Sequence, residues 1–220
     1  MQRILILGAG GHGQVVADIL LRAREAGAAI APIGYLDDNP ACWGHTLLGI
    51  PILGAIDTLD RIAHDALVIA IGDNLIRQQL FTRLQRQGCD FAVARHPAAT
   101  LAPDVPIGKG SVICAGVVVN PGSVIGANVV LNTGSTIDHN NTLADHVHVA
   151  PGVHLGGNVQ IDQGALLGIG STVMPGRRIG AWSTVGACSL VYRDIPCCAV
   201  AFGIPASVVR STSPVLASAE

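Results

Sequence analysis

An aliphatic residue recurs at every sixth position in the second half of the chain. When residues 101 to 196 are cut into sixes, the first position of every hexad is Leu, Ile or Val, and the second is mostly small or Asp/Asn. Such a period is typical of a parallel β-helix, in which each hexad forms one short strand and one corner. We therefore predict a β-helix with the first-position aliphatics inside and about five coils of eighteen residues.

The first half of the chain has a different pattern, because short apolar runs alternate there with helical stretches. We expect strands at residues 3–7, 29–36, 51–53, 66–72 and 91–95, and helices at 14–26, 57–64 and 75–87. Alternation of this kind is typical of a parallel sheet covered by helices. The predicted fold class is α/β plus β-solenoid: a small Rossmann-like N-terminal domain at residues 1–96, then a β-helix domain with a C-terminal tail at 97–220.

Composition narrows the classes of function. Apolar residues make up 50% of the chain but aromatics only 3%, which suits an aliphatic, repetitive core. The net charge of −2 gives no basic face, so we expect no nucleic-acid partner. No apolar run approaches the roughly 18 residues that span a bilayer, and we expect no membrane insertion. The six cysteines form no CxxC pair, and without a secretory signal they indicate free thiols in the cytoplasm.

A glycine-rich turn follows the first predicted strand. Residues 8–13, GAGGHG, fit GxGxxG between a strand and a helix, a pattern that lets the backbone approach a phosphate at a helix N-terminus. Asp37 and Asp38 end the second strand. Dinucleotide binding uses two mononucleotide halves, and too few strands fit before the hexads begin. We expect one nucleotide here rather than a dinucleotide, the remaining alternative being a turn that needs glycine but binds nothing.

Four histidines, His139, His146, His148 and His154, lie within sixteen positions of the β-helix. Such density suggests a metal site. Residues stacked on successive coils differ by eighteen, however, and no two of these histidines do. We therefore expect no metal site within one chain, although contacts between subunits could gather the side chains. His146 and His154 are expected to be exposed corner residues.

Six stretches in order along residues 1–208 carry a family resemblance. They are ILGAGGHGQVV, YLDDNP, AIGDNLIRQQL, HPAATLAP, the hexads around NTGSTIDH, and FGIPASVV. The chain resembles the left-handed β-helix, or hexapeptide-repeat, sugar acetyltransferases that modify nucleotide-activated amino sugars. These include the bacillosamine-pathway UDP-amino-sugar N-acetyltransferases, the GDP-perosamine N-acetyltransferases and proteins similar to sialic acid O-acetyltransferases. The resemblance implies a left-handed helix and a homotrimer with active sites between subunits.

The resemblance also implies roles for individual residues. It makes His139 the catalytic base, next to Asn140. Around the nucleotide sugar it places Gly10, Gly11, His12, Asp37, Asp38, Gly72 and Asn74. Along acetyl-CoA it places His148, Gly157, Ile169 and Ala187. Gly157 also follows His139 by eighteen residues, so the period independently puts it one coil away at the same corner. The family often has Asp or Glu where this chain has Asn140, so either Asn140 or Asp138 is left to support the base.

The leading hypothesis is an acetyl-CoA-dependent N-acetyltransferase for a UDP- or GDP-linked 4-amino-4,6-dideoxy sugar of surface glycans such as O-antigen. An imidazole with an unperturbed pKa near 6.5 can take the proton of an attacking amine. Two alternatives stay open: O-acetylation of a sugar of the sialic acid type, and a non-catalytic sugar-nucleotide sensor.

Overall fold

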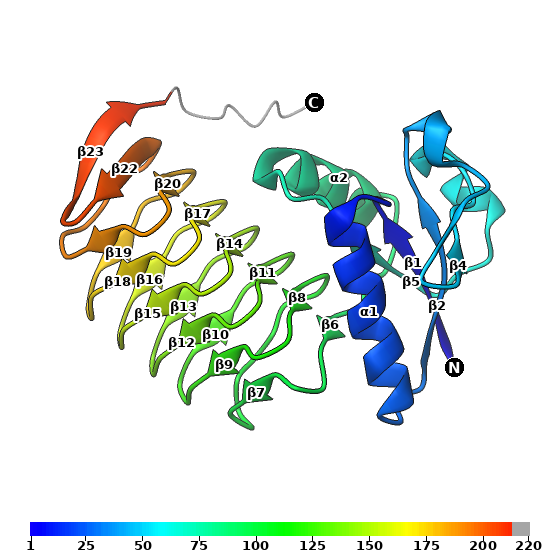
Figure 1. The fold of residues 1–220 in the computed structure, drawn as a ribbon, viewed down its shortest axis with the longest axis horizontal. Helices are drawn as coiled ribbons and strands as arrows, with labels where there is room; N and C mark the ends of the chain where they lie inside the picture. The colour runs from blue at the N-terminus through cyan, green and yellow to red at the C-terminus, as the bar shows by residue number, and fades with distance from the viewer. Residues whose placement is uncertain (213–220) are drawn as a thin grey trace.

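The computed structural model describes residues 1–212 and confirms the fold class: a small α/β domain is followed by a β-helix (Figure 1). The α/β domain holds a parallel three-stranded sheet in the order β2-β1-β5. Its strands are β1 (Gln2–Leu7), β2 (Ile30–Leu36) and β5 (Ala66–Ile69). Its helices are α1 (Gly11–Glu25) and α2 (Asn74–Arg86). Apolar residues of both helices are buried against the sheet, as the alternating pattern predicts.

Smaller elements connect β2 to β5. They are the 3-10 helices η1 (Pro40–Cys42) and η2 (Ile56–Arg61), with an antiparallel pair, β3 (Thr46–Leu47) and β4 (Ile50–Pro51), between them. The helix expected at 57–64 is therefore a short 3-10 segment. Asp73 caps α2 by accepting from the amides of Leu75 and Ile76, both at 2.9 Å, which fixes where that helix begins.

The β-helix has three parallel faces, and strands that pair on one face differ by eighteen residues for most of its length. The eight-stranded sheet contains β6 (Ala94–Arg95), β8 (Val112–Ile113), β11 (Val130–Leu131), β14 (His148–Val149), β17 (Leu166–Leu167), β20 (Thr184–Val185), β22 (Ala199–Gly203) and β23 (Ala206–Ser211). The six-stranded sheet contains β7 (Thr100–Leu101), β9 (Val118–Val119), β12 (Thr136–Ile137), β15 (His154–Leu155), β18 (Thr172–Val173) and β21 (Leu190–Val191). The four-stranded sheet contains β10 (Val124–Ile125), β13 (Thr142–Leu143), β16 (Gln160–Ile161) and β19 (Arg178–Ile179).

The helix begins earlier than the hexad pattern indicates. Ala94–Arg95 pairs with Val112–Ile113, so part of the stretch expected as a strand of the N-terminal sheet belongs to the first coil. Phe91 alone bridges to Leu67 in the α/β domain. The aliphatic pattern missed this coil because Arg95 occupies the first hexad position. From Ala94 to Ala201 the helix runs for roughly six coils of eighteen residues rather than five.

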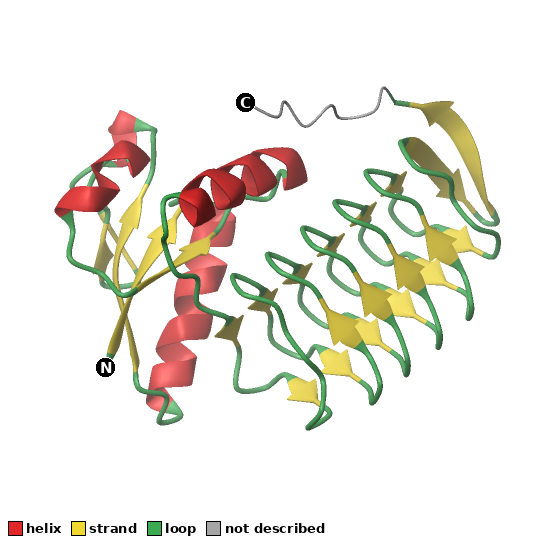
Figure 2. Cartoon of the chain, turned by 180° about the vertical axis from the view of Figure 1, so that it is seen from behind, coloured by secondary structure: helices red, strands yellow, loops and turns green. Residues whose placement is uncertain are grey.

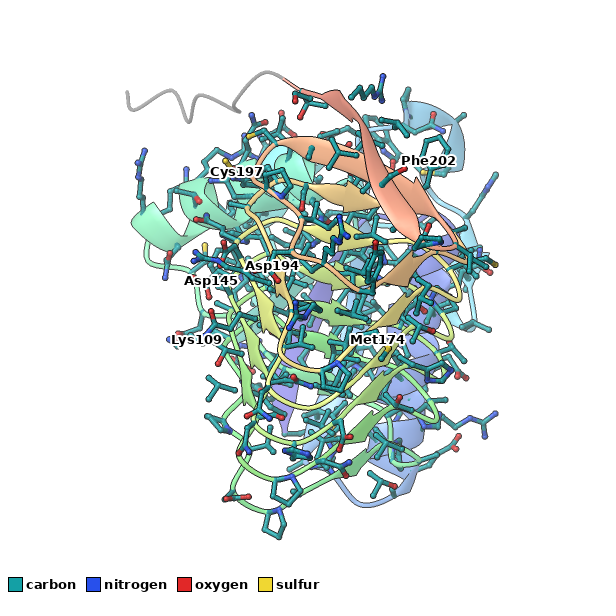
Figure 3. All side chains as sticks on the ribbon, turned by 90° about the vertical axis from the view of Figure 1, so that its left-hand side faces the viewer. Lys109, Asp145, Met174, Asp194, Cys197 and Phe202 are labelled. Atoms are coloured by element: carbon teal, nitrogen blue, oxygen red, sulfur yellow. The ribbon has the colours of Figure 1, made fainter. Side chains whose placement is uncertain are left out.

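First-position aliphatics form the core of the β-helix, as predicted. From Ile113 to Val191 every one of them is at most 3% exposed. Seen along the axis, Lys109 and Asp145, two coils apart, follow one edge of the prism (Figure 3). The antiparallel pair β22–β23 ends the solenoid on the side away from the α/β domain (Figure 2). Within residues 1–212, no helix combines the length and the hydrophobicity that crossing a membrane requires.

Candidate active site

His139 lies at a corner of the β-helix between β12 and β13, where its side chain is exposed. Its ring covers Gly157 on the next coil. A Cβ atom added to Gly157 would lie 2.5 Å from Cε1 and 2.6 Å from Nε2 of His139, distances that a real side chain cannot tolerate. The eighteen-residue spacing therefore pairs these residues as expected, and only glycine at position 157 lets the ring rest there.

Asn140 and Asp138 flank His139 in the sequence, but Asn140 contacts the imidazole ring whereas Asp138 contacts the backbone. The amide of Asn140 contacts Nδ1 of His139, with Nδ2 at 3.1 Å. Asp138 instead accepts from the backbone amide of His139 and from Nδ2 of Asn120, both at 2.8 Å. The hydrogen bond from Asn120 is the main reason that the pKa of Asp138 is lowered. The side chain at position 140 is thus the one that orients the ring, whereas Asp138 braces the backbone of the corner.

In the glycine turn at residues 8–13, two glycines are required by the backbone and two others leave open space above them. A Cβ at Gly13 would collide with the carbonyl oxygen of Gly8, and Gly8 itself has φ +109°, so both glycines are needed for the turn to close on α1. Gly10 and Gly11 are exposed, and an added Cβ would meet nothing within 4 Å. Space above these two residues is therefore open to a ligand at the N-terminus of α1.

Asp37 and Asp38 follow directly after β2, and both accept hydrogen bonds from backbone amides. Asp37 accepts from the amide of Ala9 at 2.7 Å and from that of Asn39 at 2.9 Å, so its carboxylate ties the glycine turn to the second strand. Asp38 accepts from the amide of Ile56 at 2.9 Å. It also lines a cavity of about 240 Å³ whose other walls include Ile71 and Arg83.

His12 and His148 approach each other across the junction of the two domains. Nδ1 of His148 lies 3.4 Å from the carbonyl oxygen of Gly72, while Nε2 of His12 is buried without a hydrogen-bond partner in the described structure. Burial, followed by the charge of Arg77, lowers the pKa of His12 to about 4. Burial, then Arg77 and His12, lowers the pKa of His148 to about 4. Both imidazoles are therefore neutral near pH 7.

His146 corrects an expectation, because it is buried rather than an exposed corner residue. Only 5% of it is exposed. Its Nδ1 lies 2.8 Å from Nδ2 of Asn128, and its ring packs edge-on against Phe81 of α2. Burial is the largest cause that lowers its pKa to about 4. The hexad period could not reveal this, because the α/β domain covers the corner where His146 lies. His154 is exposed, as expected.

The four histidines point away from the β-helix at different places. His139 and His146 lie at different corners, and His148 and His154 lie on different faces. In the part of the chain that the structure describes, no group of three or more His, Cys, Asp or Glu side chains could hold a metal ion.

The remaining expected acetyl-CoA residues lie at another corner. Ile169 and Ala187 are exposed between the eight-stranded and six-stranded sheets. His139 and Gly157 occupy the corner between the six-stranded and four-stranded sheets. One chain therefore does not bring the two groups together. Asn74 is nearer the β-helix than its sequence position indicates, because its Nδ2 donates to the carbonyl oxygen of Gly164 at 3.0 Å.

Arg77 was missed by the sequence analysis. It is fully buried in α2 and donates to backbone carbonyls of both domains. A signal was present, since Arg77 shares the apolar face of the helix with Leu80, Phe81 and Leu84 at spacings of three, four and seven residues. A charged residue on such a face indicates a buried polar contact.

Comparisons with known proteins identify the family of the chain. The family model of the PglD N-terminal domain matches residues 3–84. The curated UDP-N-acetylbacillosamine N-acetyltransferase of Bacillus subtilis (strain 168) is 38% identical over 119 residues, which is 52% of this chain and 52% of that protein. The match thus spans about half the length of that curated relative.

Solved structures cover nearly the whole chain. The acetyltransferase domain of PglB from Neisseria gonorrhoeae FA1090 has a TM-score of 0.88 and 33% identity, covering 95% of this chain and 100% of that one. PerB from Caulobacter crescentus, in complex with CoA and GDP-perosamine, has a TM-score of 0.85 and 36% identity, covering 94% and 97%. The chain belongs to this family of hexapeptide-repeat sugar acetyltransferases.

Proposed function

We propose that the protein transfers the acetyl group of acetyl-CoA to the amino group of a UDP- or GDP-linked 4-amino-4,6-dideoxy sugar, for the synthesis of surface glycans in the cytoplasm. His139 over Gly157 carries the proposal, because it sets an exposed imidazole directly beside a backbone corner that has no side chain of its own. The relative crystallised with CoA and GDP-perosamine supports both substrate classes.

His139 supplies the proton transfer that the reaction needs. The sugar amine is largely protonated near pH 7, and it cannot attack a thioester until it has released that proton to solvent. The imidazole takes a proton as the amine attacks the carbonyl carbon, and returns it to the sulfur as the C–S bond breaks. The backbone amide of Gly157, which has no acceptor among the described residues, is the donor we assign to the developing oxyanion.

Asn140 decides which nitrogen of His139 can act. As the side chain stands, Nδ2 of Asn140 faces Nδ1 of His139 at 3.1 Å, which leaves the ring proton on Nε2. With the amide turned over, its carbonyl oxygen accepts from Nδ1–H and leaves Nε2 unprotonated toward the substrate. Rotation of the amide by half a turn preserves the contact at Nδ1 and exchanges its donor and acceptor atoms. An asparagine at this position orients the base without adding the charge that Asp or Glu would give.

The site requires a second subunit. The α/β domain packs on the eight-stranded sheet, through Asn74 to Gly164 and His148 to Gly72, whereas His139 lies at the opposite corner of the triangular prism. A nucleotide sugar held at the glycine turn of one chain therefore meets the base of a neighbour. A homotrimer, with acetyl-CoA between His139 and Gly157 of one chain and His148, Ile169 and Ala187 of the next, brings these groups together.

Thioester cleavage measured with a panel of UDP- and GDP-linked amino sugars tests the proposal. We expect turnover with at least one 4-amino sugar and none with its 4-hydroxy counterpart. Turnover with free hydroxylated sugars alone would indicate an O-acetyltransferase instead. Binding of a nucleotide sugar without any turnover would indicate a sensor. Light scattering in the same experiment should give a trimer, and a monomer at micromolar concentration would exclude the shared site.

A further inference from the structure

Arg77 is a buried cation whose hydrogen bonds all go to backbone carbonyls. Its side chain is 0% exposed. Nη1 donates to the carbonyl oxygens of Ile71 at 3.1 Å and Gly72 at 3.4 Å. Nε donates to that of Asn128 at 3.3 Å, and Nη2 to that of His146 at 2.9 Å. One guanidinium thus joins a turn of the α/β domain to one corner of the β-helix on two successive coils.

No carboxylate within residues 1–212 forms an ion pair with this guanidinium. The carboxylate that acts electrostatically on Arg77 is that of Asp73, and it also caps α2 by accepting from the amide of Leu75. Burial is the main cause that lowers the pKa of Arg77 to about 10. Apolar residues of similar volume commonly replace buried ionic groups at little cost in stability, so stability alone is a weak reason for an arginine here.

The turn that Arg77 holds is the one expected to contact the nucleotide sugar. Gly72 lies opposite His148, and Asn74 is anchored to Gly164 on the β-helix. A cavity of about 230 Å³ is lined by Gly72, Asn74, Gly164 and Trp182, so it opens between the turn and the eight-stranded sheet. The width of this cavity therefore depends on the contacts that hold the Ile71–Gly72 turn against the β-helix.

We infer that Arg77 is a positioning residue for the nucleotide-sugar site, because its fork of donors sets the Ile71–Gly72 turn at a fixed place relative to the β-helix. The inference rests on the proposed function. Arg77 touches no substrate, since it is fully buried. A lysine cannot replace it, because one ammonium lacks the planar fork that reaches carbonyls in three directions.

Two variants and one control test the inference. Arg77→Lys keeps the charge without the fork, and Arg77→Met keeps the volume without the charge. Asn128→Gly is the matched control: Asn128 is 1% exposed and has φ +54°, which glycine adopts, and its loss leaves every carbonyl partner of Arg77 in place. Each protein is assayed for melting temperature, for kcat and both KM values, and for the Kd of UDP and GDP by calorimetry.

We expect both Arg77 variants to raise the KM for the nucleotide sugar and the Kd for the nucleoside diphosphate by about 10-fold. Their kcat should stay within about twofold of the wild type, and their KM for acetyl-CoA should rise less than that for the nucleotide sugar, because His148 meets the turn only through the Gly72 carbonyl. Asn128→Gly should lower the melting temperature and leave the KM values unchanged. Unchanged KM and Kd in folded Arg77 variants would overturn the inference, as would failure of both to fold while Asn128→Gly folds. Wild-type protein that binds UDP or GDP but acetylates no amino sugar would count against the proposed activity and not against this role.

Discussion

The β-helix and the α/β domain bury their residues by different rules. In the β-helix, the burial of a side chain follows from its position in a six-residue period, so Ile137, Leu143 and Val149 are all buried by the same geometry. In the α/β domain no single period applies, and each element is buried by the partner it meets. A substitution in the β-helix therefore changes the packing of one repeating unit. A substitution in the α/β domain changes one specific contact between elements.

The two rules meet at the junction. Asn140, Asn158 and His146 occupy the fourth position of their hexads with φ near +60°. Asn140 and Asn158 are exposed, whereas His146 is buried under α2. Local conformation is thus set by the repeat, while exposure at the junction is set by the other domain. The following predictions separate effects that arise within the β-helix or within the α/β domain from effects that arise at the contact between the two domains.

Removal of the base should have the largest effect. His139→Ala or His139→Asn should lower kcat by about 10²- to 10⁴-fold, the usual contribution of a positioned general base. The wild-type rate should not respond to EDTA, because a base needs no metal ion. His154→Ala, on a strand of the six-stranded sheet rather than at the corner of His139, is the control and should change kcat little. Near-full kcat in His139→Asn would show that catalysis rests on positioning and backbone amides alone.

Displacing the ring without removing it should have the next largest effect. Gly157→Ala places a Cβ against the ring of His139, which must then move away from its corner. We expect kcat to fall by about 10- to 100-fold, because a shift near 1 Å costs this much in catalysis. Gly176→Ala, at the corner one coil above, meets no atom within 4 Å but has φ +69°. It should therefore lower the melting temperature without a comparable loss of kcat.

The junction should make stability depend on pH. His146 has a folded pKa of about 4 and an unfolded value near 6.5. Below pH 6.5 the unfolded chain takes up a proton that the folded chain does not, so stability falls as the pH drops toward 4. The contribution of this one residue between pH 7 and 5 is on the order of 2 kcal/mol.

His146→Asn tests that dependence. Asparagine tolerates the positive φ, and the backbone carbonyl that Arg77 contacts is retained. Chemical denaturation at pH 7 and pH 5 should show a smaller loss of stability in the variant than in the wild type. His154→Asn is the exposed control, and equal pH dependence in all three proteins would contradict the burial of His146.

The smallest effect on turnover is expected at Gly11, an open position of the glycine turn. Gly11→Leu should raise the KM for the nucleotide sugar by about 10-fold while leaving that for acetyl-CoA nearly intact, because the space it fills is at the N-terminus of α1. Gly13→Ala should instead prevent folding, since its Cβ meets the Gly8 carbonyl. Equal weakening of both substrates by Gly11→Leu would mean that the two sites are not divided between the domains.

Periodicity made the β-helix predictable, including the pairing of His139 with Gly157, because one spacing determines every neighbour. It failed at the first coil, where Arg95 stands in an aliphatic position, and at His146, whose burial depends on α2. Arg77 could be suspected from the apolar face of its helix, but its four carbonyl partners could not. Backbone carbonyls carry no signature in the side-chain pattern, so contacts to them are known only from the structure.

The hydrogen bonds across the junction also bear on the order in which the chain assembles. Each coil needs only the eighteen residues after it to gain a neighbour, whereas Arg77 and His146 are 69 residues apart and Asn74 and Gly164 are 90 apart. During synthesis from the N-terminus, α2 therefore leaves the ribosome well before the corners that receive it. Closing such long loops carries a larger entropic cost than adding a coil. Docking of the α/β domain is accordingly expected as a late step, after several coils have already formed.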